Sequence, residues 1–242
     1  MKQITEPYLL IAATCPCYAT VDGERFLNEL WAKDLALHPE YLVNLTVAAP
    51  CVVGVPPSDA VSTRSDPRLL RIAFVDLPAP SQTFFQALLN VPLVIYRLWC
   101  AVASASVVHA GLVGWPYPIG WIGILLAKLR RRFVMIVVES APWRISAGAK
   151  PSTKKRVRAL IYERLNRAFV NVADLNIFTQ EEYLRSMLRR AGLRGIVIHA
   201  SWIDDADILQ LSDAQADWKL KASEGCALRL LFAGRLTQEK GS

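Results

Sequence analysis

The sequence lacks the cysteine pattern of a zinc-binding or disulfide-stabilised protein. Its five cysteines are an odd number, and none shows the two-residue gap with a matching second pair that a zinc site needs. Cys15 and Cys17 are separated by one residue, which is one short of the usual dithiol motif. We therefore expect no metal site and reduced, mostly packing thiols, as in a cytoplasmic protein. The five are Cys15, Cys17, Cys51, Cys100 and Cys226.

Signatures of targeting and of nucleotide binding are missing as well. Lys2 and Glu6 are followed by an apolar run of only six residues, Tyr8 to Ala13, which is too short for a secretory signal. No Gly-x-Gly-x-x-Gly follows this run, which argues against a dinucleotide-binding Rossmann enzyme. The glycine spacing before Lys240 excludes a Walker P-loop. No nucleic-acid-binding motif occurs, so we expect no nucleic-acid partner.

The charge balance is basic. Lysine and arginine outnumber aspartate and glutamate by 28 to 21, which gives a net charge of +7 and an isoelectric point near 9.3. This excess favours an anionic partner, which could be a membrane surface, a nucleic acid or a phosphorylated substrate. The apolar stretch Ser106 to Leu129 is long enough for a membrane span, but His109, Pro116 and Pro118 interrupt it. We predict a buried strand, a loop and a helix there instead.

Short apolar runs bounded by turn residues recur along the chain and predict buried strands. Their hydrophobicity is nearly continuous rather than alternating, which is typical of a parallel sheet covered on both faces. The runs are Tyr8 to Ala13, Leu42 to Ala48, Arg71 to Val75, Ser106 to Ala110, Phe133 to Val138, Leu175 to Phe178, Gly195 to His199 and Leu228 to Ala233.

Helical patterns lie between these runs. Glu24 to Leu37 and Thr153 to Val172 both carry apolar residues at helical spacing. Thr179 to Glu182 has the form of a capping box that opens another helix, and Gly192 is placed to end it. The alternation of strand and helix predicts a Rossmann-like α/β domain with a doubly wound parallel sheet.

The composition changes near residue 200. Ala200 to Glu224 is rich in aspartate and has little strand character, whereas Leu228 to Ala233 is a fresh apolar strand. We predict one domain over residues 1–203 and a linker with the start of a second domain over residues 204–242. A second α/β domain needs on the order of another hundred residues, so we expect the chain to be truncated.

The last dozen residues carry the clearest motif. The run Leu230 to Gly241 follows a strand with Gly-Arg-Leu and, a few residues on, Lys-Gly. This run resembles the start of the donor domain in family 4 retaining glycosyltransferases, which have the GT-B fold. The resemblance implies that Arg235 and Lys240 neutralise the leaving diphosphate of a sugar nucleotide, without a metal ion or cofactor.

A weaker part of the resemblance lies near the N-terminus. In the loop Val21 to Phe26, Gly23, Glu24 and Arg25 match a glycine-rich loop of the family, and the match implies that Gly23 lies near the donor diphosphate. Asp22 stands where the family has a glycine. The same residues also fit an ordinary helix N-terminus with Asp22 as the N-cap.

Two candidate catalytic residues follow predicted strands. Val107 to Ala110 matches the family's strand that ends in a histidine, so His109 is a candidate, although such a histidine is often satisfied locally. Glu139 follows the next strand, where many family members place a histidine or acidic residue near the acceptor. Its carboxylate could accept the proton or hydrogen bond of an acceptor hydroxyl, or it could cap a neighbouring helix.

Two further segments resemble the family without carrying a predicted site. Ala173 to Glu182 matches a run that leads from a strand into a helix, and we expect its role to be structural. His199 to Asp204 stands where the family has a linker, and only its last positions agree, so we do not place His199 in the site.

Basic residues gather at Lys128 to Arg132 and again from Lys150 to Arg158. A solvated surface is one interpretation. The other is a peripheral contact with an anionic membrane surface, supported by Trp115, Tyr117 and Trp121 nearby, because enzymes that resemble this chain often use lipid-linked acceptors at the cytoplasmic leaflet.

The sequence therefore predicts part of a glycosyltransferase of polysaccharide or glycoconjugate biosynthesis. A nucleotide sugar would be the donor, and a carbohydrate or lipid-linked hydroxyl would be the acceptor, with retention. We expect a cytoplasmic location, peripheral at the inner membrane face, and no turnover by the 242-residue chain alone. The alternative is a non-catalytic membrane- or partner-binding Rossmann-like domain. A third interpretation, a different Rossmann enzyme, is the one that the missing Gly-x-Gly-x-x-Gly argues against.

Overall fold

The computed structural model describes residues 3–79, 83–114, 117–145, 150–189, 194–198 and 210–223. The chain divides into two compact units, Met1–His199 and Ala200–Ser242. In the second unit the described part is helix α6, Leu211–Ser223. The predicted strand Leu228 to Ala233, together with Gly192, His199, Cys226, Arg235 and Lys240, lies outside the described residues.

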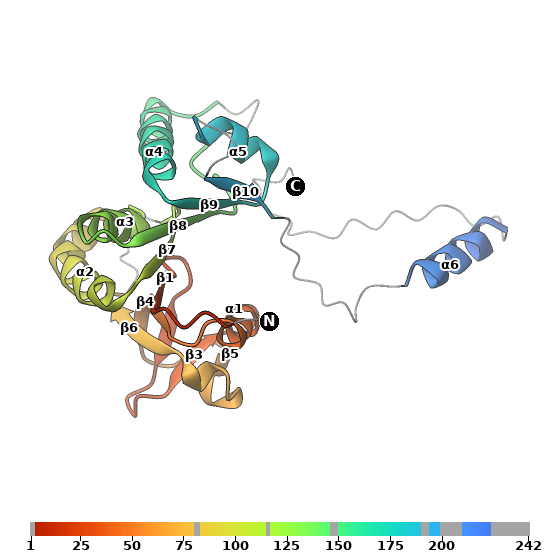
Figure 1. Ribbon diagram of the computed structural model, residues 1–242, viewed down its shortest axis with the longest axis horizontal. Helices are drawn as coiled ribbons and strands as arrows, with labels where there is room; N and C mark the ends of the chain where they lie inside the picture. The colour runs from red at the N-terminus through yellow and green to blue at the C-terminus, as the bar shows by residue number, and fades with distance from the viewer. Residues whose placement is uncertain are drawn as a thin grey trace. The chain divides into compact units, whose positions relative to one another are not determined.

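The first unit is built on one mixed, mainly parallel sheet (Figure 1). Seven parallel strands form its main part, in the spatial order β6-β4-β1-β7-β8-β9-β10. Numbered along the chain, this order is 3-2-1-4-5-6-7, which extends the classic doubly wound arrangement. The strands are β1 Tyr8–Ile11, β4 Leu45–Val53, β6 Ala73–Leu77, β7 Val107–Gly111, β8 Phe133–Val138, β9 Leu175–Phe178 and β10 Gly195–Val197.

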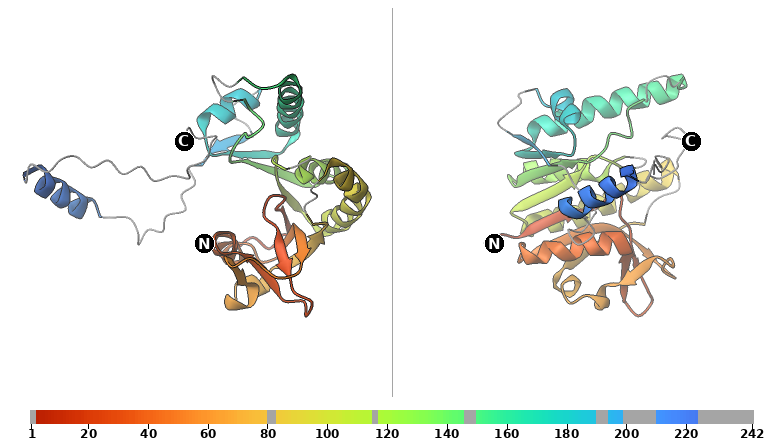
Figure 2. Two further views of the ribbon diagram at one scale, coloured as in Figure 1. Left: turned by 180° about the vertical axis from the view of Figure 1, so that it is seen from behind. Right: turned by 90° about the vertical axis from the view of Figure 1, so that its right-hand side faces the viewer.

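Helices cover both faces of the sheet, so the predicted fold class is confirmed. Helix α1 packs on one face, over a core that includes Leu27, Leu35 and Val47. The other helices of this unit lie on the opposite face, over a larger core around Leu9 and Ile136 (Figures 1 and 2). The helices are α1 Glu29–Leu37, α2 Phe84–Ser104, α3 Ile119–Leu129, α4 Thr153–Val172 and α5 Glu181–Met187.

The strongest sequence patterns are confirmed to the residue. Strands β8 and β9 and helix α4 have the predicted bounds. The apolar stretch Ser106 to Leu129 forms strand β7, a connecting loop and helix α3, as predicted, rather than one long helix.

The predicted helix Glu24 to Leu37 is wrong in its first turn. Residues Arg25–Asn28 form strand β3, and α1 begins only at Glu29, where the Asn28 side chain accepts a hydrogen bond from the Leu30 N–H at 3.2 Å. Asn28 rather than Asp22 is therefore the N-cap.

Strand β3 belongs to a small antiparallel extension of the sheet that the sequence did not predict. It pairs with β2, Cys17–Ala19, and with β5, Ala60–Ser62, and β2 in turn lies beside the last residues of β4. These strands are only three or four residues long, too short for a periodic pattern to indicate them.

The predicted capping box at the start of α5 is also wrong, although the helix itself is present. The Thr179 hydroxyl donates to the carbonyl oxygens of Glu139 at 2.9 Å and Val138 at 3.4 Å, and so does not cap the helix. Gln180 is the N-cap residue, and its side chain makes no capping hydrogen bond.

Helix α2 has no counterpart among the predicted elements. It is the one helix in the described part of the chain that is long and apolar enough to cross a membrane, with a mean hydropathy of 1.5. It connects β6 to β7, which run parallel in the same sheet, and it buries Val94, Leu98 and Val102 against that sheet. It is therefore a crossover helix on the sheet.

Helix α3 approaches the sheet unusually closely. A Cβ atom on Gly120 would lie 2.0 Å from the carbonyl oxygen of Gly111, and one on Gly123 would lie 2.1 Å from Cδ1 of Ile11. These two glycines let the start of α3 pack directly on β7 and β1, in the middle of the sheet.

We predict that Gly120→Ala lowers the free energy of unfolding by about 1–3 kcal/mol, because the new methyl group meets backbone that has no room to move. Gly111→Ala is the matched control, since a Cβ atom there would meet nothing within 4 Å. Urea unfolding followed by circular dichroism measures both. Equal stability of the two variants would contradict this account of the packing.

Candidate functional site

The winding of the sheet reverses at β1. From β1 the chain passes to β4 and β6 on one side and then returns to β7, β8, β9 and β10 on the other. In open α/β sheets, ligands bind outside the carboxyl ends of the strands at such a reversal. The strands here end nearly level, because Ile11 pairs with Ala110 and Val138 pairs with Phe178. The loops that follow β1, β7, β8 and β9 therefore share one edge.

Glu139 lies at this edge, directly after β8, as the sequence predicts. Its side chain is exposed. Its carbonyl oxygen accepts the 2.9 Å hydrogen bond from the Thr179 hydroxyl, which joins the ends of β8 and β9. The backbone that carries the carboxylate is thus held while the carboxylate itself faces solvent, an arrangement suited to a group that meets a substrate hydroxyl.

Cys15 lies at the same edge of the sheet. Sequence reasoning did not include it in the site, because it interpreted the cysteines as packing residues. The thiol is half-buried in the loop after β1. Burial raises its pKa, and the carboxylates of Glu139 and Asp34 raise it further, whereas a hydrogen bond with Thr14 opposes them. Both residues follow strands that end at this edge, Cys15 after β1 and Glu139 after β8, on the two sides of β7. The position of Cys15 just past the first predicted strand was the sequence signal that could have placed it at this edge.

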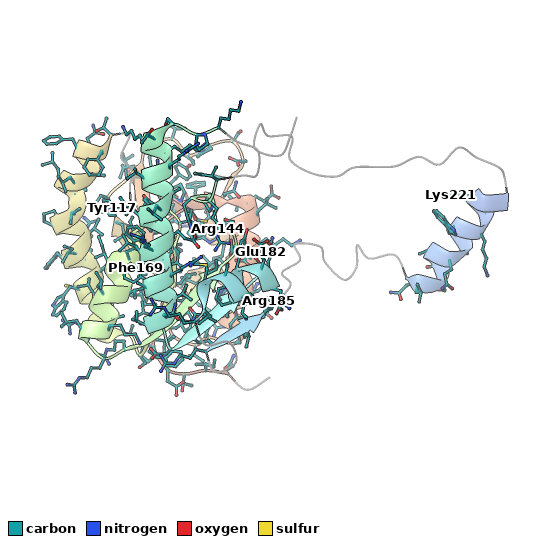
Figure 3. All side chains as sticks on the ribbon, turned by 90° about the horizontal axis from the view of Figure 1, so that it is seen from above. Tyr117, Arg144, Phe169, Glu182, Arg185 and Lys221 are labelled. Atoms are coloured by element: carbon teal, nitrogen blue, oxygen red, sulfur yellow. The ribbon has the colours of Figure 1, made fainter. Side chains whose placement is uncertain are left out.

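The loop after Glu139 is fixed by a network centred on Glu163 of α4. Its carboxylate accepts hydrogen bonds from Trp143 Nε1 at 2.7 Å and from Arg144 at 2.9 and 3.1 Å. Arg144 also donates to Ser186 of α5 at 2.8 Å and lies 3.9 Å from Glu182 (Figure 3). Burial alone would raise the pKa of Glu163, but these donors hold that pKa below its ordinary value.

His109 occupies a different environment. It is the third residue of β7, two positions before the strand ends at Gly111, so it lies within the strand and not in the loop that follows. Its Nδ1 lies 3.1 Å from the Tyr8 hydroxyl. Burial lowers the pKa of His109 to about 4, with a smaller contribution from His38. Burial raises the pKa of Tyr8, so its hydroxyl stays protonated and shares a hydrogen bond with a neutral imidazole.

Gly23 lies in the exposed turn between β2 and β3, with a positive φ of 82°. Its backbone N–H donates to the Thr20 carbonyl at 3.0 Å and so is already used within the turn. Glu24 of the same loop accepts a hydrogen bond from Ser62 Oγ. The conformation explains why glycine stands here, since other residues rarely adopt it.

Arg25 is engaged in an ion pair. Its guanidinium donates to both carboxylate oxygens of Asp76, at 2.5 and 3.0 Å, and lies 5.1 Å from the centre of the Phe74 ring. Arg97 of α2 also donates to the Asp76 carbonyl. Asp76 thus ties the β2–β3 hairpin and α2 to strand β6.

Asp76 also belongs to the one cluster of potential metal ligands found in the described part of the chain. The sulfur atoms of Cys17 and Cys51 and a carboxylate oxygen of Asp76 lie within 4.8 Å of one another. Both oxygens of Asp76 already accept from Arg25, and burial raises the pKa of Cys17 to about 12. As they stand, these groups form an ion pair beside two protonated thiols.

The predicted site residues are thus only partly brought together. Glu139 lies at the carboxyl edge near Cys15, His109 contacts Tyr8 within the sheet, and Gly23 lies in a hairpin turn. In the described residues none of the three hydrogen-bonds to another.

No protein-family profile matches the chain, and no curated protein matches its sequence. Among solved structures, a UDP-N-acetylglucosamine 2-epimerase from Listeria monocytogenes is 11% identical with a TM-score of 0.38 over 76% of the chain. A second UDP-N-acetylglucosamine 2-epimerase is 11% identical with a TM-score of 0.40 over 78% of the chain. The chain spans 42% and 46% of these two proteins.

A sucrose-phosphate synthase from Thermosynechococcus elongatus is 12% identical, with a TM-score of 0.41 over 91% of the chain and 100% of that structure. All three structures are of enzymes named for a sugar nucleotide or a sugar phosphate. Similarity at this level assigns neither a family nor a reaction to the chain.

The relation between Glu139 and Cys15 can be tested chemically. We predict that Glu139→Gln speeds the alkylation of Cys15 about twofold to fivefold, because removal of one partly screened negative charge lowers the thiol pKa. Iodoacetamide labelling located by tandem mass spectrometry measures the rate. Glu181→Gln is the matched control, since Glu181 does not perturb Cys15. An unchanged rate in Glu139→Gln would place the two groups apart.

The surroundings of His109 predict a pH dependence of stability. Between its ordinary pKa of 6.5 and about 4, the unfolded chain binds a proton that the folded chain does not. Stability should therefore fall as pH drops through this range, by at most about 1.4 kcal/mol per pH unit. Urea unfolding of wild type and His109→Gln measures the slope. The variant should show a smaller slope, and identical slopes would refute the neutral imidazole in the folded chain.

Proposed function

We propose that the chain is the acceptor-side part of a glycosyltransferase that moves a sugar from a nucleotide sugar to a hydroxyl acceptor with retention. The observation that carries the proposal is the run Leu230 to Gly241, which resembles the donor-domain start of family 4 and follows a Rossmann-type domain. The topology supports it, because the sheet offers a ligand edge at its winding reversal.

Glu139 takes the acceptor-side role in this proposal. Its exposed carboxylate stands at the carboxyl edge on backbone that Thr179 holds in place. A carboxylate there can accept the hydrogen bond of an acceptor hydroxyl and its proton as the new bond forms. A catalytic role for His109 stays a prediction. Its half-buried position against Tyr8 does not favour that role.

The donor side rests on charge. Arg235 and Lys240 would stabilise the negative charge that develops on the departing nucleoside diphosphate, which requires no metal ion. Gly23 would contribute by leaving space beside its turn rather than by donating a hydrogen bond, because its N–H is bound to Thr20. The acceptor would be a carbohydrate or a lipid-linked hydroxyl in polysaccharide or glycoconjugate biosynthesis, at the cytoplasmic side of a membrane.

A second candidate function is a non-catalytic, membrane- or partner-binding domain. The observation that favours it is the apolar outer face of α2, which includes Phe85, Leu89 and Tyr96, each about two-thirds exposed. This candidate needs neither Arg235 nor Lys240, so binding experiments separate the two.

We predict that one class among UDP-, GDP- and ADP-sugars binds the chain and that Arg235→Ala combined with Lys240→Ala weakens binding at least about tenfold. Two charge-assisted contacts to a diphosphate are worth about this much or more. Isothermal titration calorimetry of the purified 242-residue chain measures the affinity.

The matched control removes two other lysines of the second unit, Lys219 and Lys221, which are exposed on α6. Lys219→Ala with Lys221→Ala should leave binding unchanged. If no sugar nucleotide binds, or if both double variants lose affinity equally, the donor-site assignment is wrong. Vesicle binding that persists without Arg235 and Lys240, with no sugar-nucleotide binding, would favour the second candidate.

A further inference from the structure

Helix α2 is apolar on both its inner and its outer side, although only the inner side is covered. Its inner side packs on the sheet through Val94, Leu98, Ala101 and Val102. Its outer side carries large apolar groups that are exposed to solvent. These are Phe84, Phe85, Leu88, Leu89, Leu93, Ile95, Tyr96 and Trp99, with relative exposures between 38% and 66%. A surface helix normally carries one apolar stripe, toward the core, so a second apolar side calls for an apolar environment of its own.

Helix α3, which packs beside α2, also exposes large apolar groups. Leu125 and Leu129 of α3 are 60% and 71% exposed. Side chains of α2 project from the outer side of the first unit in Figure 3. We name this surface, the outer side of α2 with Leu125 and Leu129, the α2 face. Soluble proteins rarely leave so many large apolar groups together, and such patches mark contact with a partner or a membrane.

Two of the three aromatic residues that the sequence suggested for a membrane contact are used elsewhere, and the third, Trp115, lies outside the described residues. Trp121 donates to Asn166 of α4 at 2.7 Å, and Tyr117 donates to the Ala87 carbonyl at 3.2 Å. Lys128 is likewise paired with Asp174 at 2.6 Å. These groups hold α3 to its neighbours, so they are not part of the α2 face.

The charges on α2 and α3 themselves are of one sign. No aspartate or glutamate occurs between Asp76 and Glu139, a segment that contains all of α2 and α3. Arg130, Arg131 and Arg132 follow α3 at the end where α2 also finishes. The Arg130 guanidinium lies 3.7 Å from the centre of the Trp99 ring, and Arg132 donates to the Ala103 carbonyl at 2.6 Å. An apolar face thus ends in an aromatic ring beside a cluster of cations.

We propose that the α2 face docks on the surface of an anionic phospholipid bilayer. Helix α2 would lie in the plane of the interface, with Phe85, Leu89 and Tyr96 among the acyl chains. The arginines at its end would meet lipid phosphates. Apolar insertion together with electrostatic attraction is the combination by which interfacial helices bind anionic membranes. A spanning position is excluded, since β6 and β7 at the two ends of α2 belong to one sheet.

Charge also favours lipid over a second copy of the chain. A symmetric dimer through the α2 face would place identical surfaces against each other. In such a dimer Arg130 and Arg131 would find no carboxylate on α2 or α3 of the other copy to pair with, since neither helix carries one. Lipid phosphate supplies the opposite charge.

Docking stands independently of the proposed reaction, because none of its residues belongs to the donor or acceptor site. If both proposals hold, docking would bring a lipid-linked acceptor within reach of the enzyme. Failure of one leaves the other intact, since vesicle binding involves neither a sugar nucleotide nor Glu139.

The test is co-sedimentation of the 242-residue chain with vesicles of phosphatidylcholine alone and of phosphatidylcholine with an equal part of phosphatidylglycerol. We expect binding to the anionic vesicles only. Phe85→Glu with Leu89→Glu should weaken binding on the order of tenfold or more. Arg131→Asn should weaken binding about fivefold, because it removes one basic residue. Asparagine is chosen because it tolerates the positive φ of 55° at this position.

The matched control places the same charges on exposed valines of the antiparallel extension. Val21→Glu with Val55→Glu changes residues that are 98% and 95% exposed and should leave vesicle binding unchanged. Circular dichroism and the urea midpoint establish that each variant is folded. No binding of the wild type to anionic vesicles, or equal losses in both double variants, would overturn the proposal. So would a dimer in analytical ultracentrifugation that Phe85→Glu with Leu89→Glu abolishes.

A second measurement does not depend on charge-inserting variants. Cys100 is an exposed thiol of α2, whereas the other described cysteines are buried or half-buried. A nitrobenzoxadiazole label on Cys100, in a chain with Cys226→Ser, should shift its emission to the blue when anionic vesicles are added. An emission spectrum that stays unchanged while the chain co-sediments would show that another surface binds the lipid.

Discussion

Gly120 and Gly123 let α3 approach β7 and β1 more closely than any other residue would allow. This contact lies where the winding of the sheet reverses, and the rest of the first unit is arranged around it. It sets the start of α3 at the carboxyl edge, between the loops that follow β1 and β8. It also sets the layer on which α2 and α4 pack, because Trp121 of α3 stacks on Phe169 and hydrogen-bonds to Asn166.

Two surfaces with different chemistry follow from this arrangement. The carboxyl edge is polar, and it presents the Glu139 carboxylate on a backbone that is fixed by Thr179 and by the network around Glu163. The α2 face is apolar and ends in cations. The first surface suits a sugar hydroxyl, and the second suits a lipid interface. An enzyme that uses a lipid-linked acceptor needs both kinds of surface.

Local sequence patterns predicted the parts of the fold that local chemistry controls. Phe133–Val138 and Leu175–Phe178 are continuous apolar runs between turn residues, and Thr153–Val172 has a clear helical period, so all three were predicted to the residue. Helix α2 was not predicted because its exposed outer side is apolar as well as its buried inner side, so its apolar residues do not mark a single buried face. Arg25–Asn28 was assigned to a helix because its strand is set by pairing with β2 and β5 rather than by its own residues.

The candidate site was predictable only one residue at a time. The position of Glu139 follows from the end of an apolar strand, which the sequence shows. The contact between Tyr8 and His109 joins residues 101 positions apart, and the proximity of Cys15 to Glu139 depends on β1 and β8 flanking β7. Such relations depend on strand order, which no single segment encodes. Thr179 was predicted to be a helix cap because a threonine hydroxyl before a helix often accepts from its first turn. In the folded sheet the same hydroxyl donates to the Glu139 carbonyl instead, a partner that the local sequence does not show.

The most direct test of the account is whether a ligand meets the carboxyl edge of the sheet. Hydrogen–deuterium exchange of the chain, with and without the sugar nucleotide it binds best, measures this segment by segment. The account predicts slower exchange in the loops after β1, β7, β8 and β9, which contain Cys15, Gly114, Glu139 and Thr179, and unchanged exchange in α2. Protection confined to α2 or to the amino ends of the strands would contradict it.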